Sequence, residues 1–296
     1  MSSIRTVPSN GITLAYESIG DPDAVPVLLV MGLGTQMLAW HDEFCQLLAE
    51  RGHHVIRFDN RDIGLSTHLR EESAGHPIAA LAGRKPPYVI PDMADDAAGL
   101  LDQLAPEGAH VVGVSMGGCI SQTLAIRRPE LVRSLTSMSS STASRRVGRP
   151  RFDIAAMMVT RRPATNRAGA VAASIDTWKR IGSPGYPFNR ERAERLAGEA
   201  YDRCYDPAGV SRQFAAILGT PDRTLALRRL DVPTLVLHGE ADPLISVSGG
   251  RATAAAIPGA RLVTYPGMGH DIPDALWASF VEEISAVVAR GEQVPR

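Results

Sequence analysis

One serine of the chain stands between glycines, where an apolar run gives way to a helical pattern. The segment "VVGVSMGGCI", residues 111–120, contains the motif G-x-S-x-G with Ser115 at its centre. In the strand–turn–helix context this motif places the serine on a tight turn that exposes its hydroxyl at the carboxyl end of a sheet. Ser115 is therefore predicted to be the nucleophile of an acyl-transfer reaction.

A serine hydroxyl is a weak nucleophile until a base takes its proton, and the base needs a carboxylate to orient it. Along chains with this turn the order is serine, acid, histidine. The segment "HGEADPLI" places Asp242 after one predicted strand, and "YPGMGHDIP" places His270 after the next. We predict a catalytic triad of Ser115, Asp242 and His270.

Other residues compete for two of these roles. Glu240 and Asp271 are alternative acids close in sequence, although Asp242 has the better spacing. His68 and His76 lie in the long connection 68–90, predicted to be a mobile flap near the site, and their position alone does not exclude them as bases.

The tetrahedral intermediate of acyl transfer needs hydrogen-bond donors for its oxyanion. One predicted donor is the backbone N–H of Met116, directly after the nucleophile, and the other is the N–H of Leu33 in "MGLGTQ". Gly32 and Gly34 would let that loop turn its amides inward, although an ordinary glycine turn would look the same.

Strand and helix patterns alternate along most of the chain. Asn10-Gly11 predicts a β-hairpin turn. Buried strands are predicted in 26–34, 53–66 (ending in a polar loop), 110–115, 131–140, 234–239 and 260–266, and helices in 40–52, 91–105, 116–128 and 275–290. This alternation predicts an α/β fold with a mostly parallel central sheet flanked by helices on both faces.

The alternation breaks once, and the break predicts an inserted helical cap at residues 143–230, with a core formed by 1–142 and 231–296. The cap carries 17 lysines and arginines against 8 acids, whereas the core has an excess of acids. Either the two parts have complementary charge across their seam, or the basic cap attracts anionic substrates or lipid surfaces.

Composition excludes several classes of protein. A net charge of −1 gives no nucleic-acid signature. Three scattered cysteines without a C-x-x-C pair argue against a disulfide framework or a zinc site and suit a cytoplasmic protein. No secretory signal or membrane span is evident, and no metal site is expected. The oligomeric state stays open, with a homodimer among the options.

The ordered set "MGLG", "DNRDIGLS", "GVSMGG", "HGEADPL" and "GMGH" resembles the α/β-hydrolase superfamily across nearly all of the chain outside the cap. Within it the chain looks most like the carboxylesterase group of aclacinomycin methylesterase-type enzymes. The resemblance implies the same triad, the Leu33 and Met116 oxyanion hole, a cap over the site and no cofactor.

Two residues depart from the wider superfamily. Met31 stands where many members have histidine, and Asp62 stands where many have glycine. Both look familiar in the methylesterase-like group, so they bear on the substrate rather than on the chemistry. Ser115 argues against epoxide hydrolases and haloalkane dehalogenases, which use aspartate at that position.

The sequence thus predicts a serine carboxylesterase that hydrolyses small to medium esters through an acyl-enzyme. An acyl pocket is predicted from large apolar residues that could equally be core: Trp40, Met157, Met158, Trp178 and Phe214. The same triad would serve a cofactor-free perhydrolase or a C–C bond hydrolase. A ligand-binding protein on an inactive hydrolase fold is the most remote alternative.

Overall fold

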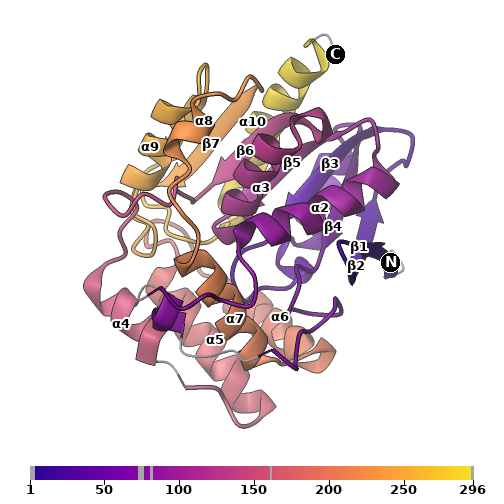
Figure 1. Cartoon of the computed structure of the whole chain (residues 1–296). Helices are drawn as coiled ribbons and strands as arrows, with labels where there is room; N and C mark the ends of the chain where they lie inside the picture. The colour runs from indigo at the N-terminus through magenta and orange to yellow at the C-terminus, as the bar shows by residue number, and fades with distance from the viewer. Residues whose placement is uncertain (1–3, 73–76, 81–82, 161, 295–296) are drawn as a thin grey trace.

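The centre of the fold is an eight-stranded sheet, seen in a computed structural model that describes residues 4–72, 77–80, 83–160 and 162–294 (Figure 1). The strand order is β1-β2-β4-β3-β5-β6-β7-β8. The strands are β1 (Arg5–Ser9), β2 (Ile12–Ile19), β3 (Val25–Val30), β4 (His53–Phe58), β5 (Ala109–Val114), β6 (Val132–Met138), β7 (Thr234–Gly239) and β8 (Arg261–Tyr265). Neighbouring strands from β4 to β8 pair in parallel, while β2 is antiparallel to β1 and β4.

Helices cover both faces of this sheet, as predicted from the alternation of patterns. Alternate residues of a strand point to opposite faces, so Leu28 and Val30 of β3 join one core cluster and Val27 and Leu29 the other. The first cluster packs against α2 (Ile90–Leu104) and α3 (Met116–Arg127), and the second against α1 (Asp42–Ala49) and α10 (Trp277–Glu292). The helix α9 (Ser248–Ala256) follows β7.

The predicted hairpin is confirmed at the edge of the sheet. Asn10 and Gly11 have φ values of 46° and 78°. Two successive residues with positive φ are what a two-residue hairpin turn requires, and Ser9 pairs directly with Ile12.

Five helices between β6 and β7 form what we call the helical segment. They are α4 (Phe152–Thr160), α5 (Arg167–Ile181), α6 (Arg190–Arg203), α7 (Pro207–Leu218) and the short α8 (Thr224–Leu227). Figure 1 shows α4 to α7 gathered beyond one end of the sheet. Three of their arginines pair with carboxylates outside the segment: Arg192 with Asp274 at 2.7 Å, Arg203 with Asp59 at 3.1 Å and Arg212 with Asp62 at 2.7 Å. These pairs agree with the first of the two interpretations of the charge split.

The long connection at 68–90 is described only in part. The short 3₁₀ turn η2 (Pro77–Ala80) packs against α7. His76 lies outside the described residues, so its predicted candidacy as a base and the predicted mobility of the flap stay predictions. No helix within the described ranges is long and apolar enough to cross a membrane.

Candidate active site

Ser115 occupies the sharp turn between β5 and α3. Its backbone has φ 58° and ψ −119°, a conformation that non-glycine residues rarely adopt. Such a conformation costs of order 1–3 kcal/mol and persists only where the surrounding structure holds it in place. The Ser115 N–H donates to the Met138 carbonyl at 2.9 Å, and the Ser140 hydroxyl donates to the Ser115 carbonyl at 2.8 Å. The end of β6 and the residues just after it therefore hold this turn.

The glycines near Ser115 allow two segments of backbone to cross closely. A Cβ atom at Gly117 would collide with the carbonyl group of Val30, at the end of β3. A Cβ at Gly32 would lie 3.2 Å from the Cβ of Ser115. The loop that follows β3 is thereby brought against the side chain of Ser115.

His270 connects Ser115 to Asp242. Its Nε2 lies 2.9 Å from Ser115 Oγ, and its Nδ1 lies 2.7 Å from Asp242 Oδ2. A carboxylate only accepts, so Nδ1 carries the hydrogen and Nε2 is free to accept one from the serine hydroxyl. His270 and Asp242 are buried, and Ser115 is partly exposed. The structure therefore brings the three predicted residues into one hydrogen-bonded chain.

The loop after β7 holds the carboxylate of Asp242. The Leu244 and Ile245 N–H groups each donate to Asp242 Oδ1 at 2.8 Å. His238 Nε2 donates to the Ile245 carbonyl at 2.8 Å and lies 3.6 Å from Asp242 Oδ2. Burial lowers the pKa of His238, so this ring is neutral near pH 7 and places no second positive charge beside the carboxylate.

The alternative candidates for acid and base have other partners. Glu240 Oε1 accepts from the Thr264 hydroxyl at 2.8 Å. Asp271 accepts a hydrogen bond from the Ser183 hydroxyl, and burial raises the pKa of Asp271. His68 contacts Asp206 and lies in a different network.

The helical segment forms hydrogen bonds with the loop that carries His270. The His270 N–H donates to the carbonyl of Ile181, the last residue of α5, at 2.7 Å. Just beyond α5, the Ser183 hydroxyl accepts from the Gly269 N–H at 2.8 Å while it donates to Asp271. The backbone around His270 is thus fixed by α5 and the turn after it.

The two predicted oxyanion donors belong to segments that adjoin Ser115. Met116 is the first residue of α3, and N–H groups in the first turn of a helix have no partner within it. Leu33 follows Gly32 in the loop beside Ser115 and is partly exposed. A carbonyl oxygen between them would meet backbone donors and the positive end of the α3 dipole.

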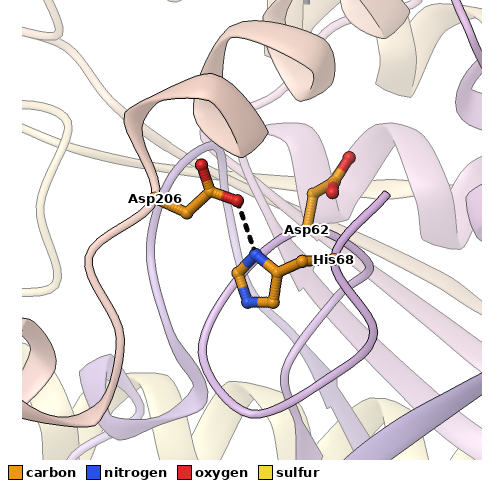
Figure 2. Close-up of side chains that lie close together, drawn as sticks. All are labelled: Asp62, His68 and Asp206. Carbon is orange, nitrogen blue, oxygen red and sulfur yellow. Dashed lines mark hydrogen bonds and ion pairs between the residues drawn. The ribbon is translucent and has the colours of Figure 1, made fainter. Parts of the chain in front are cut away.

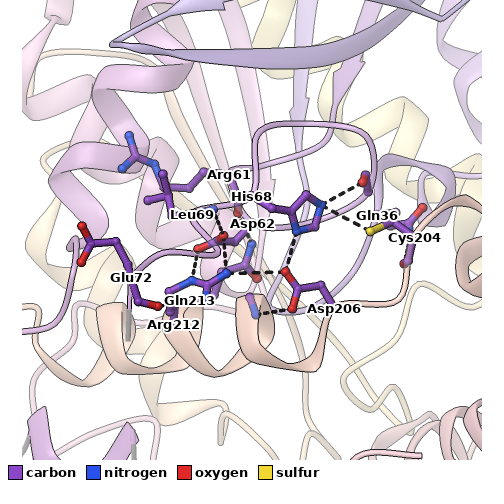
Figure 3. Close-up of polar contacts among 12 residues, drawn as sticks. Gln36, Arg61, Asp62, His68, Leu69, Glu72, Cys204, Asp206, Arg212 and Gln213 are labelled. Carbon is purple, nitrogen blue, oxygen red and sulfur yellow. Dashed lines mark hydrogen bonds and ion pairs between the residues drawn. The ribbon is translucent and has the colours of Figure 1, made fainter. Parts of the chain in front are cut away.

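A second polar cluster links the loop after β4 to α7. Figure 2 shows Asp62, His68 and Asp206, each of which has one potential metal-ligand atom within 4.8 Å of those of the other two. His68 Nδ1 bonds Asp206 Oδ2 at 2.7 Å, and His68 Nε2 lies 3.0 Å from the Gly64 carbonyl. Arg212 binds both oxygens of Asp62, at 2.8 and 2.7 Å (Figure 3). Because Arg212 already occupies both oxygens of Asp62 and brings its positive charge within 3.5 Å of Asp206 Oδ2, this cluster does not suit a metal cation.

The backbone and contacts of Asp62 account for an aspartate at a position where many superfamily members have glycine. The φ of Asp62 is 67°, the left-handed region that favours glycine. Its carboxylate is nevertheless fully used: Tyr88 OH donates at 2.8 Å and the Leu69 N–H at 2.7 Å, in addition to Arg212. Burial and the adjacent Asp62 carboxylate raise the pKa of Tyr88, which stays a hydrogen donor.

The five predicted pocket residues lie in different places. Trp40 is fully buried and stacks on Phe44 at a centroid distance of 5.6 Å, within the core cluster under α1 and α10. The other four are partly exposed in the helical segment: Met157 and Met158 in α4, Trp178 in α5 and Phe214 in α7. The acyl pocket formed by these residues stays a prediction.

Sequence reasoning missed the residues that hold the site from outside. Gln213 of α7 accepts from the Gly34 N–H, and Ser183 and Ile181 hold the His270 loop. No motif marks them, since each is a common residue in or just after a helix. Only Asp62 gave a signal, as an aspartate where glycine is usual.

Comparison with known proteins connects this geometry to a family. Residues 25–274 match the family described as "alpha/beta hydrolase fold". Rhodomycin D methylesterase DauP of Streptomyces sp. (strain C5) is 30% identical, over 95% of this chain and 97% of that protein. Rhodomycin D methylesterase DnrP of Streptomyces peucetius matches with the same identity and coverage. The crystal structure of the enol-lactonase from Burkholderia xenovorans LB400 superposes with a TM-score of 0.75, at 23% identity, covering 96% of this chain and all of that one.

Proposed function

This chain belongs to the alpha/beta hydrolase fold family, and we propose that it hydrolyses carboxylic esters with Ser115 as its nucleophile. The proposal is supported above all by the hydrogen-bonded chain from Ser115 Oγ through His270 to Asp242, with distances of 2.9 and 2.7 Å. The methylesterase names of its relatives support esters as the substrate class.

In the first step His270 Nε2 takes the proton of the Ser115 hydroxyl as Oγ attacks the acyl carbon. The imidazolium that forms is stabilised by Asp242, which keeps Nδ1 protonated and the ring in place. The Leu244 and Ile245 N–H groups occupy the other carboxylate oxygen, so the carboxylate keeps one orientation toward Nδ1.

The carbonyl oxygen becomes an oxyanion as the tetrahedral intermediate forms. The N–H groups of Met116 and Leu33 are the proposed donors, and a donor of this kind contributes about 10²–10³ in kcat. His270 then protonates the leaving alcohol, and the acyl group stays on Ser115. Water, deprotonated by the same imidazole, cleaves this acyl-enzyme and restores the serine.

We further propose that the helical segment is the cap of this active site. Its support is the set of hydrogen bonds that α5 and α7 make with loops at the carboxyl ends of β8 and β3. Met157, Met158, Trp178 and Phe214 would then face the acyl or alcohol part of the ester. Trp40, which is enclosed in the core, would support the pocket wall from behind.

Methyl esters and p-nitrophenyl acetate or butyrate are the first substrates to test. Ser115→Ala should lower kcat by at least about 10³-fold while the melting temperature changes little. Ser285→Ala is the matched control, because that hydroxyl bonds His53 at the start of β4, the opposite end of the strands. Turnover retained in Ser115→Ala would refute the proposal.

Two further assays separate the reactions that share this triad. Peroxide-dependent bromination in acetate buffer would indicate perhydrolysis, in which peroxide replaces water at the acyl-enzyme. Cleavage of ring-fission diketones would indicate C–C bond hydrolysis. A chain that neither turns over esters nor reacts with a fluorophosphonate at Ser115 would instead be a binding protein.

A further inference from the structure

Gln213 of α7 lies between the loop after β3 and the loop after β4 and forms a hydrogen bond with each. Its Oε1 accepts from the Gly34 N–H at 2.9 Å, and its Nε2 donates to the Arg61 carbonyl at 2.7 Å. The side chain is fully buried. Since one partner can only donate and the other only accept, the orientation of this amide is determined by its surroundings.

The bond to Gly34 fixes one peptide group of the loop that carries Leu33. The carbonyl end of the Leu33–Gly34 peptide accepts from the Thr35 hydroxyl at 3.0 Å, and its N–H end donates to Gln213. The preceding peptide carries the Leu33 N–H, and its carbonyl, that of Gly32, accepts from the Thr35 N–H at 3.4 Å. The direction of the Leu33 N–H thus depends on a short turn that Gln213 holds from outside.

This turn needs external support because glycines flank Leu33 on both sides. Gly34 has a φ of +63°, and glycine reaches several other conformations at little cost. The Leu33–Gly34 peptide would therefore be free to flip if its N–H lost its partner. Val210, one turn before Gln213, also packs here: a Cβ at Gly34 would lie 2.9 Å from Val210 Cγ1.

The neighbour of Gln213 anchors α7 itself. Arg212 and Asp62 form an ion pair that is shielded from solvent, and Asp206 at the start of α7 bonds His68 (Figure 3). Both contacts involve the same loop after β4 whose Arg61 carbonyl receives Gln213 Nε2. The amide of Gln213 is therefore held at a fixed distance from Gly34.

We propose that Gln213 is the positioning residue of the oxyanion hole, acting through Gly34 to aim the Leu33 N–H at the reacting carbonyl. The inference rests on the proposed ester hydrolysis by Ser115. Gln213 touches no reacting atom in this account. Its loss should impair the step in which the oxyanion forms and leave the binding of the ester almost unchanged.

The test compares Gln213→Leu with Gln122→Leu in the full chain. Gln122 is the matched control: it is also fully buried, and its amide also bonds two partners, Ser137 and Arg223, neither of them in the Leu33 loop. In Gln213→Leu, kcat for p-nitrophenyl butyrate should fall at least about tenfold with KM changed less than about threefold. Gln122→Leu should lose thermal stability to a similar extent but keep kcat within about threefold of the parent.

The inhibition constant of a trifluoromethyl ketone distinguishes a positioning role from a general loss of stability, because lower stability alone would not change it. The ketone adds to an active serine as a tetrahedral adduct with an oxyanion, so its inhibition constant in Gln213→Leu should rise by the same factor by which kcat/KM falls. If Gln213→Leu does not fold, Gln213→Met, which also removes the acceptor for Gly34 but has a side chain of nearly the same length as glutamine, replaces it and should show the same rise.

The outcomes are distinguishable. An unchanged kcat and inhibition constant in the folded Gln213 variant, or an equal loss of kcat in Gln122→Leu, would overturn the positioning role while the esterase stands. A parent protein that neither hydrolyses esters nor binds the ketone would overturn the proposed function, and this inference with it.

Discussion

Arg212 and Asp62 form an ion pair, 2.7 Å long, in which both side chains are shielded from solvent although the residues lie 150 positions apart. Replacing Arg212 by Met leaves the Asp62 carboxylate without its cation, which typically costs about 3–5 kcal/mol. We expect the free energy of unfolding of Arg212→Met, measured by urea denaturation, to fall by about 3 kcal/mol.

A double variant checks the cause of this loss. Asp62→Gly removes the stranded carboxylate and suits the φ of 67° at that position. Asp62→Gly combined with Arg212→Met should therefore recover much of the stability that Arg212→Met loses alone. Equal losses in the single and double variants would mean that the buried charge is not the cause.

Gly117→Ala should disrupt the turn between β5 and α3, which crosses the end of β3. The added Cβ would meet the carbonyl of Val30, the last residue of β3, and this strand cannot move aside because it pairs with β4 and β5. We expect a lowered melting temperature and loss of fluorophosphonate labelling at Ser115. Gly169→Ala is the control, because that glycine lies in the first turn of α5 and its added methyl meets only the Asn166 and Ala164 side chains. A well-folded, fully labelled Gly117→Ala protein would contradict the close approach of Gly117 to the Val30 carbonyl.

His110 should make the fold sensitive to acid. It lies in β5 between Ser134 and Glu292, and burial outweighs the nearby carboxylate and lowers the pKa of His110 to about 4. The unfolded chain, with a histidine pKa near 6.5, binds more protons than the folded chain between these values, so stability falls as the pH drops from about 6.5 to about 4. The loss amounts to about 3 kcal/mol for this one group.

The measurement is urea denaturation at several pH values in the parent and in His110→Gln, which keeps a polar side chain but does not titrate. The parent should show the steeper fall in unfolding free energy below pH 6.5. Identical slopes in the two proteins would show that His110 takes up its proton as easily when folded as when unfolded.

Ser183→Ala should impair catalysis through the loop that carries His270. The Ser183 hydroxyl accepts from the Gly269 N–H and donates to Asp271, the residues on either side of His270. Without it we expect kcat to fall about tenfold and fluorophosphonate labelling to slow in parallel, since both need the same imidazole. Ser183→Thr, which keeps the hydroxyl, should restore most of both rates. Ser246→Ala, which removes a bond to Ser248 alone, is the control and should leave both unchanged.

The sheet and the triad geometry could be predicted from the sequence because their signals are local. Apolar runs bounded by glycines mark the parallel strands, and residues that follow such strands must meet at one edge. Ser115 directly follows β5, and Asp242 and His270 lie in the loops just after β7 and β8, so the positions of the strands predict that the three residues meet. The Asn10-Gly11 hairpin was likewise encoded in two adjacent residues.

The contacts that support the site were not predictable in this way. Gln213 and Gly34 are 179 positions apart, and nothing in the spacing of α7 distinguishes a glutamine that bonds a loop from one that faces water. The same holds for Ser183, which lies after a helix without any strand nearby in sequence. The placement of Trp40 in the core also depends on how α1 packs, which apolar composition alone does not determine.

The helices α5 and α7 themselves supply hydrogen-bond acceptors to two N–H groups of the site: Gly34 through Gln213, and His270 through the Ile181 carbonyl. Transplanting this stretch from a relative to obtain a new ester preference would therefore replace part of the catalytic scaffold together with the binding surface. A chimera of this kind should work only where the donor sequence restores an acceptor at both positions, so the junctions matter less than those two contacts.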